Sequence, residues 1–159
     1  GILGVEGYPV VVEADVSEGL PGFTMVGYLS GAVREAQDRV RTALKNSGFR
    51  LPARKITVNL SPADIRKEGT GFDLPIAVAV LAATGLVDQS ILDTSVLVGE
   101  LGLDGRIKPV SGILSIVAAA GNAGKKRFSS DSQCERGTDH REHRHHWRGG
   151  HQRAGGYVK

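Results

Sequence analysis

Cysteine and long apolar runs are nearly absent from this chain of 159 residues. A single cysteine excludes an internal disulfide framework. No run reaches the roughly 18 apolar residues of a membrane-spanning helix and no secretory signal is evident, so we expect a cytoplasmic protein without membrane contact. Charge of one sign does not dominate either, because 20 Lys and Arg oppose 17 Asp and Glu. The length suffices for one domain with its own core.

The sequence also lacks the two common nucleotide-binding motifs. Gly69-Thr70-Gly71 precedes an apolar stretch, and glycine loops at helix starts often bind phosphate. A P-loop, however, ends in Gly-Lys-Ser/Thr, and a dinucleotide site needs Gly-x-Gly-x-x-Gly. Here Phe72 and Asp73 follow, and the acidic Asp73, which we expect to cap the helix, would repel phosphate. We therefore predict no cofactor site in these residues.

Residues 55–85 combine an expected strand, a polar loop and an apolar helix. The strand alternates apolar and polar residues, which is typical of burial on one face. Its apolar members are Ile56, Val58 and Leu60. The loop at 63–72 carries charged residues and two glycines. The segment 74–83 is almost wholly apolar with Pro75 in its first turn, which predicts a helix buried nearly all round.

Elements on both sides complete a mixed α/β fold. Apolar positions in 30–46 recur at helical spacing, with Ser30 as N-cap and Asn46-Ser47-Gly48 as the stop. Asp104-Gly105 predicts a β-hairpin. In chain order, the other expected elements are strands at 2–16 and 23–26 that form an antiparallel hairpin-like unit, a strand at 95–101, a helix at 113–123 and a strand beginning at 125–128. This order indicates an α/β (α+β) domain whose helices pack on a mixed sheet.

The polar face of the helix at 30–46 allows two interpretations. It carries both signs of charge, so a solvated surface with i,i+4 pairs is the simpler one. A helix facing nucleic acid is the alternative, which the acidic residues weaken. The residues of this face are Arg34, Glu35, Asp38, Arg39, Arg41 and Lys45.

Several short stretches match a known family. They are Gly4-Val5-Glu6-Gly7-Tyr8, Gly19-Leu20-Pro21-Gly22-Phe23, Val58-Asn59-Leu60-Ser61-Pro62-Ala63-Asp64, Lys67-Glu68-Gly69, Phe72-Asp73-Leu74-Pro75, and Gly99-Glu100-Leu101 with Gly105-Arg106. On these stretches the chain resembles the N-terminal domain of the magnesium-chelatase-like, ComM-type competence proteins. That domain is Lon-protease-like and has the ribosomal S5 domain 2-like fold. The resemblance covers 1–128, which we assign to this domain.

The Lon-like resemblance implies a serine-lysine peptidase and says where both catalytic residues would lie. Gly71 occupies the expected serine position and Leu114 the expected lysine position. Glycine has no nucleophile and leucine cannot accept a proton, so we expect a non-catalytic domain. The alternative is a peptidase of Lon type with relocated residues. Its candidates are Ser61, Ser111 and Ser115 as nucleophiles, with Lys67 or Lys108 as base.

The resemblance also implies partners. Family members resemble hexameric AAA+ motors that act on branched DNA in natural transformation. ATP and Mg²⁺ would belong to their AAA+ domain, whose Walker A motif these residues lack. The domain here would then serve assembly or contact DNA. The candidate contact residues are Arg54, Lys55, Arg66 and Lys67, and a solvated loop at 64–70 is the alternative.

Four acidic residues raise the question of a metal site. Asp64, Glu68, Asp73 and Glu100 lie near Arg66, Lys67 and Arg106 in the sequence of the matching stretches. Carboxylates in such settings more often form ion pairs or cap helices, so we predict no metal site here.

The tail at 129–159 differs in composition from the rest of the chain. It holds all five histidines, the single tryptophan and the single cysteine, while apolar residues nearly vanish. The histidine spacing matches no zinc-site pattern. For 133–153, codons can be chosen whose reading one nucleotide later gives an apolar, strand-like segment that resembles the family's continuation. We therefore expect a frame-shifted tail without a core, and sequencing the gene tests this.

Overall fold

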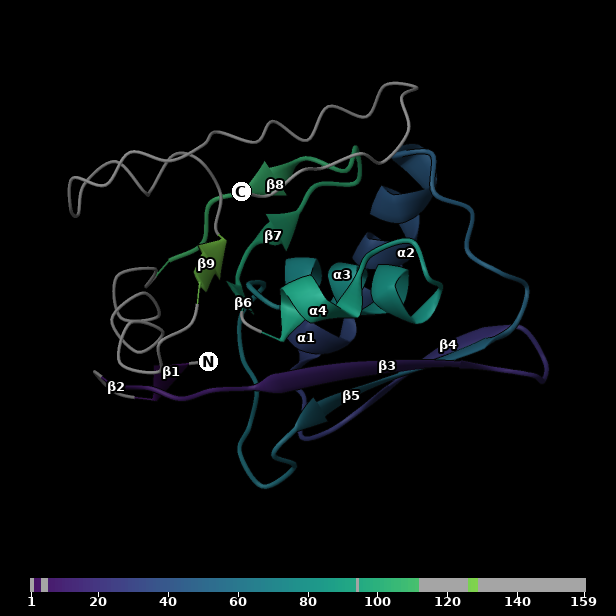
Figure 1. Cartoon of the computed structure of the whole chain (residues 1–159). Coiled ribbons are helices and arrows are strands. Elements are labelled where there is room, and N and C mark those ends of the chain that lie inside the picture. The colour runs from purple at the N-terminus through teal and green to yellow at the C-terminus, as the bar shows by residue number, and fades with distance from the viewer. Residues whose placement is uncertain (1, 4–5, 94, 112–125, 129–159) are drawn as a thin grey trace.

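The computed structural model describes residues 2–3, 6–93, 95–111 and 126–128, and its central element is strand β5 (Lys55–Ser61) (Figure 1). β5 lies between β3 (Val11–Ser17) and β4 (Gly22–Val26) in a three-stranded sheet. It pairs antiparallel with β3 and parallel with β4, so the sheet is mixed. The expected alternation is confirmed, because Ile56, Val58 and Leu60 are buried.

The expected antiparallel pairing of the first two strands is wrong. β5 is inserted between β3 and β4, so these two strands share no ladder. The backbone N–H of Gly22 donates to the carbonyl of Arg54 at 3.3 Å, which joins the start of β4 to the start of β5. The turn at 19–22 reverses the chain, but β4 reaches its partner through a helical crossover, as parallel pairs require. The turn signal was correct and the inferred partner was not.

Four helices are present in the described residues: α1 (Gly31–Arg34), α2 (Ala36–Asn46), α3 (Asp73–Ala83) and α4 (Gln89–Leu92). The expected helix at 30–46 is therefore two helices that meet at Glu35. Ser30 is confirmed as N-cap, because its Oγ accepts the Val33 N–H at 3.4 Å. The stop is also confirmed, since Gly48 has a φ of 87° after α2. α4 was not expected.

α3 begins one residue earlier than predicted, which changes the role of Asp73. Phe72, not Asp73, is the N-cap, and Asp73 is the first helical residue, fully buried. Pro75 lies in the first turn as expected. The helix is buried nearly all round, because none of its residues before Ala83 is fully exposed. Its buried apolar residues are Ile76, Ala77, Val80 and Leu81.

Three small strand pairs surround this centre. β1 (Ile2–Leu3) and β2 (Glu6–Gly7) pair antiparallel, and β6 (Ser95–Leu97) pairs parallel with β9 (Lys126–Phe128). β7 (Glu100–Leu101) and β8 (Ile107–Lys108) form the expected hairpin. The expected strand at 95–101 is split at Gly99, whose backbone instead bonds to Gly71 and Leu74.

The described elements form layers with the helices in the middle. Figure 1 shows the sheet of β3, β5 and β4 on one side of the helices and the β7–β8 hairpin on the other. The core lies between them and includes Phe23, Val33, Val40, Val58 and Val80. A mixed sheet with packed helices is the predicted fold class, which is confirmed. The predicted helix at 113–123 and the tail at 129–159 lie outside the described residues.

Candidate functional site

Lys67 belongs to the loop at 63–72, and its side chain is buried although we expected it to form a contact on the surface. Its side chain is 0% exposed, and its ammonium donates to the carbonyl oxygens of Pro62 and Ile65, the latter at 2.7 Å. Its backbone also bridges to the chain after β4, accepting from Ser30 and donating to Tyr28. The expected DNA contact requires an exposed ammonium, whereas the charge of Lys67 is buried and holds the loop in place.

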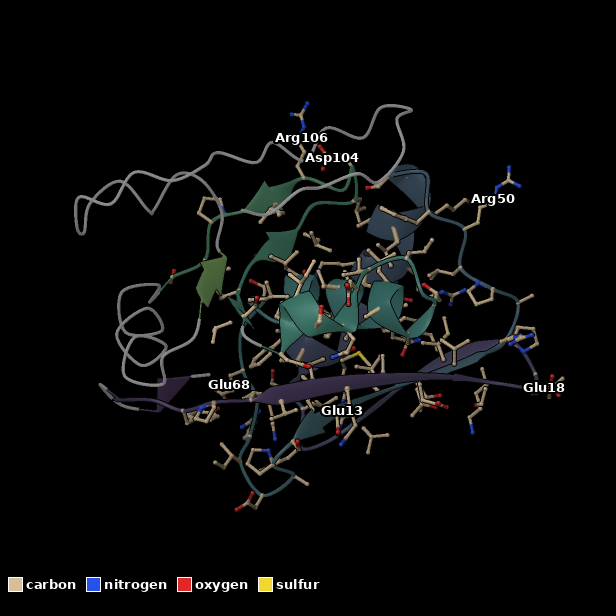
Figure 2. The ribbon with its side chains drawn as sticks, in the orientation of Figure 1. Glu13, Glu18, Arg50, Glu68, Asp104 and Arg106 are labelled. Carbon is tan, nitrogen blue, oxygen red and sulfur yellow. The ribbon has the colours of Figure 1, made fainter. Side chains whose placement is uncertain are left out.

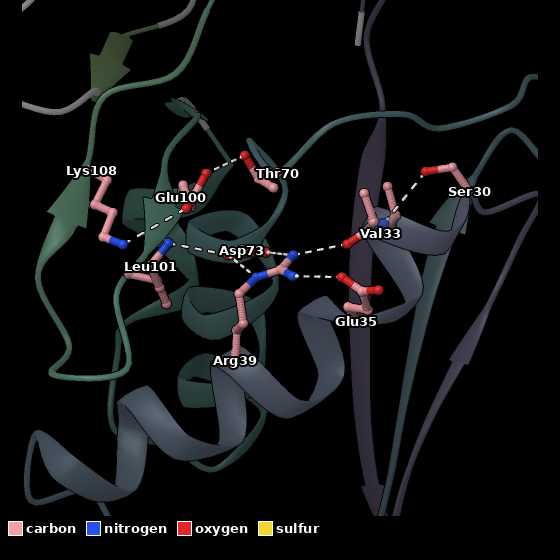
Figure 3. Close-up of polar contacts among 10 residues, drawn as sticks. Ser30, Val33, Glu35, Arg39, Thr70, Asp73, Glu100, Leu101 and Lys108 are labelled. Atoms are coloured by element: carbon pink, nitrogen blue, oxygen red, sulfur yellow. Dashed lines mark hydrogen bonds and ion pairs between the residues drawn. The ribbon is translucent and has the colours of Figure 1, made fainter.

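Asp73 joins three elements through one buried carboxylate (Figure 3). Its oxygens accept from Arg39 on α2 at 2.8 and 3.0 Å, and from the Leu101 backbone N–H of β7 at 3.1 Å. The guanidinium of Arg39 donates further to the Ala32 carbonyl at 2.8 Å and pairs with Glu35 at 3.5 Å. The buried carboxylate of Asp73 and the guanidinium of Arg39 therefore both have hydrogen-bond partners, as is usual for buried polar groups.

Arg39 remains charged in this cluster at every physiological pH. Its pKa is raised above the usual value of an arginine, chiefly by the hydrogen bond with Asp73, while partial burial opposes the shift. A group whose pKa is raised on folding stabilises the fold below its unfolded pKa and loses this effect only as the pH rises through the folded value. That window lies above the usual pKa of arginine and so above any physiological pH, so we assign the cluster a structural role and no proton transfer.

Gly71, where the resemblance places a nucleophilic serine, lies at the end of the same loop. Its carbonyl accepts the Gly99 N–H at 3.1 Å, which fixes its position against the strand segment that leads into β7. A Cβ added there would lie 3.1 Å from Val98 Cγ2 and 3.8 Å from Val110 Cγ1. The nearest described atoms to this added Cβ therefore belong to apolar side chains.

Thr70 is the residue before Gly71, so its hydroxyl lies next to the position at which the resemblance places the catalytic serine. Its Oγ1 donates to Glu100 Oε2 at 2.5 Å, and Lys108 Nζ lies 4.0 Å from the other oxygen of Glu100 (Figure 3). This contact therefore anchors the loop to the β7–β8 hairpin.

The relocated dyads considered from the sequence do not form in the described residues. There, no serine hydroxyl is hydrogen-bonded to a lysine ammonium. Lys67 is committed to carbonyl oxygens, and Lys108 faces Glu100. Ser115 and Leu114 lie outside the described residues.

The four candidate contact residues do not form one surface. Arg54 and Lys55 are exposed at the start of β5, whereas Arg66 lies beyond its end and pairs with Glu68 at 3.3 Å. A strand of this length spans about 20 Å, at about 3.3 Å per residue. Lys67 is buried. Only Arg54 and Lys55 therefore remain adjacent, unpaired and exposed.

The four acidic residues do not converge either. Glu68 pairs with Arg66, Asp73 with Arg39, and Glu100 with Thr70 and Lys108. Arg106 pairs with Asp104 at 3.5 Å instead of with any of the four. Within the described residues, no group of three metal-binding side chains is present.

The mixed sheet with its packed helices is that of a Lon-like domain, and distant relatives agree with the fold. The Lon protease of Koribacter versatilis (strain Ellin345) is 25% identical over 135 residues, which is 80% of this chain and 16% of that protein. Residues 12–130 match the family model described as subunit ChlI of Mg-chelatase. The chain therefore belongs to this magnesium-chelatase-like family.

Closer relatives place the chain among ComM-type proteins, as their N-terminal domain. YifB of Escherichia coli (strain K12) is 51% identical over 124 residues, covering 78% of this chain and 24% of that protein. The competence protein ComM of Haemophilus influenzae is 49% identical over 118 residues, covering 74% of this chain and 23% of that protein. The chain thus spans about a quarter of the length of these curated relatives. In the part of the chain that the structure describes, no helix is long and apolar enough to cross a membrane.

Proposed function

We propose that this domain is a non-catalytic Lon-like module of a magnesium-chelatase-like AAA+ ATPase, which resembles the ComM motor that acts on branched DNA. The observation that carries the proposal is Gly71, which supplies no nucleophile at the position where the resemblance requires one. Its backbone is not in the left-handed region, so the backbone angles do not themselves demand glycine. The catalytic side chain is missing while the loop around it remains anchored.

The rest of the proposal concerns the part of the relatives that this chain does not span. ATP binding, Mg²⁺ binding and hydrolysis would belong to an AAA+ domain, which is the expected partner of this module. The full-length protein would form a hexamer in the cytoplasm, where this domain contributes to assembly or contacts DNA. The similarity to ComM over three quarters of the chain supports this assignment.

Peptidase activity tests the non-catalytic assignment directly. We expect no ATP-independent cleavage of fluorescently labelled casein and no labelling by a serine-directed fluorophosphonate. Gly71→Ser should also be inactive, because Leu114 supplies no base and Val98 leaves only 3.1 Å for the new Cβ. The loss of one dyad member typically lowers the rate roughly 10⁴-fold or more.

Gly71→Ala is the matched control for this experiment, because it adds the Cβ without the hydroxyl. Cleavage by the pure wild-type chain would overturn the proposal and support a relocated dyad. Labelling of Gly71→Ser but not of Gly71→Ala would show that a base lies within reach of this position.

A further inference from the structure

A basic hollow lies between α2 and the segment that leads into β5. It has a volume of about 710 Å³ and lies at the start of β4 and β5. Four basic residues line it, namely Arg41, Lys45, Arg50 and Arg54. Asp38 is the one acidic residue of its lining. Arg50 extends away from the ribbon on this side of the molecule, far from Arg106 (Figure 2).

The four basic residues of the hollow are free to bind a ligand. All four are exposed, and within the described residues none of them has a carboxylate partner. Elsewhere in the described residues, three arginines have carboxylate partners, since Arg39 pairs with Asp73, Arg66 with Glu68, and Arg106 with Asp104, whereas Arg34 and Lys55 have none. Unpaired positive charge is therefore concentrated here, although residues 1–128 hold 14 Lys and Arg against 13 Asp and Glu.

The electrostatic balance of the hollow favours an anion. Asp38 contributes one negative charge, and the C-terminal end of α2 contributes roughly half a charge more. Four cations exceed this sum by more than two charges. Arg41 and Lys45 are spaced i,i+4 and so project from one face of α2, toward the segment that carries Arg50 and Arg54.

The shape of the hollow favours an extended polyanion over a small ion. Its volume is much larger than one phosphate group, and its lining also includes the apolar residues Phe23, Leu51 and Ile56. Three of its four cations are arginines, whose planar guanidinium matches the two oxygens of a phosphodiester. Such a lining suits the sugar-phosphate backbone of a nucleic acid.

We propose that this hollow, and not the loop at 64–70, binds the phosphodiester backbone of DNA. The inference rests on the DNA contact in the proposed function and gives it a place. The nucleic-acid-facing role considered for the polar face of 30–46 is then confined to Arg41 and Lys45 at its end. Binding is independent of base sequence and depends strongly on salt, because only phosphates are contacted.

The test is fluorescence anisotropy with a labelled single-stranded oligonucleotide and its duplex, on the whole chain from about 50 to about 200 mM salt. Comparison between variants cancels any constant contribution of the tail. Arg50→Ala with Arg54→Ala should weaken binding about tenfold or more at low salt. The slope of log K against log salt should fall by about 1.4 for the single strand and about 1.8 for the duplex.

Two control variants decide whether location matters. Arg66→Ala with Arg106→Ala removes the same charge from other exposed positions and should leave the salt slope unchanged. Asp38→Asn removes the one acidic residue of the hollow and should tighten binding about two- to threefold, a gain that misfolding cannot mimic. Circular dichroism confirms that each variant is folded.

The outcomes separate this inference from the proposed function. If DNA binds equally well to the hollow variant and to the control, the hollow is not the site, and the proposed function stands. If the wild-type chain binds no DNA but binds poly-glutamate through the same residues, the hollow recognises an acidic protein segment. The DNA contact then falls as well, and the cleavage assay decides the non-catalytic role independently.

Discussion

At the scale of single residues, the two buried charged side chains, Asp73 and Lys67, each have hydrogen-bond partners that compensate for their burial. Asp73 satisfies two donors of Arg39 and the backbone N–H of Leu101, and so connects α3 to α2 and β7. Lys67 donates to the carbonyl oxygens of Pro62 and Ile65, which lie in the same segment of the chain. Both side chains hold the loop and its flanking elements together, which makes them structural residues.

Removal of the Asp73 carboxylate should strongly destabilise the domain. We expect Asp73→Ala to lower the free energy of unfolding by about 3 kcal/mol, because it leaves Arg39 without its main partner and one backbone donor unsatisfied. Arg39→Ala combined with Asp73→Ala should cost less than the sum of the single changes. Urea unfolding followed by circular dichroism measures these differences.

Arg41→Ala is the matched control for that series, since it removes an exposed arginine from the same helix. Its effect on the free energy of unfolding should stay within about 0.5 kcal/mol. An Asp73→Ala variant no less stable than Arg41→Ala would show that the buried pair contributes nothing to the fold.

Residue types alone predicted the apolar core but not the buried charges. The alternation of apolar and polar residues predicted the burial of Ile56, Val58 and Leu60. Lys67 belongs to a run of charged residues, and its partners are backbone oxygens, which cannot be identified from residue types. Arg39 carried a signal that was missed. It lies three residues after Ala36 and one before Val40, both buried, and therefore near the buried face of α2.

At the scale of elements, the boundaries were predictable wherever local chemistry fixes them. Ser30 caps α1 and the turn at Asp104-Gly105 forms the β7–β8 hairpin, because capping and turn geometry depend on neighbouring residues. The partner of β4 was not predictable in this way. Strand order depends on which apolar faces meet across the crossover, and that is decided by packing far along the chain.

Two glycines at the ends of elements give opposite expectations for the same substitution. Gly27, just after β4, has a φ of 132°, and a Cβ there would lie 2.7 Å from the Leu60 carbonyl oxygen. Gly27→Ala should therefore destabilise the domain by about 2 kcal/mol or more. Gly31 begins α1 with nothing within 4 Å of an added Cβ, so Gly31→Ala should stabilise it by about 0.5 kcal/mol.

Thermal unfolding of both glycine variants checks this pair. For a domain of this size, the midpoints should move in opposite directions, by several degrees for Gly27→Ala and by about two degrees for Gly31→Ala. A Gly27→Ala variant as stable as the wild type would mean that the end of β5 shifts without cost.

At the scale of the whole molecule, one apolar core joins the central sheet to the helices and to the β7–β8 hairpin in the described residues. Within the described residues, the core cluster draws its residues from β4, α1, α2, β5, α3 and β7 and from the loops beside them. The family model matches 12–130, so the similarity also covers this region. The tail at 129–159 contributes few apolar residues, and a segment of that composition cannot form a core.

A chain that ends at Phe128 should therefore unfold like the full chain. We expect the midpoint of thermal unfolding to change by less than about two degrees, which corresponds to roughly 0.5 kcal/mol for a domain of this size. Phe128 is kept because β9 (Lys126–Phe128) pairs with β6. A shorter chain that ends at Lys125 is the matched control, and it should unfold at a lower temperature because β6 loses its partner strand. A drop of several degrees on removal of 129–159 alone would show that the tail packs on the domain, and the frame-shift interpretation of its sequence would then be wrong.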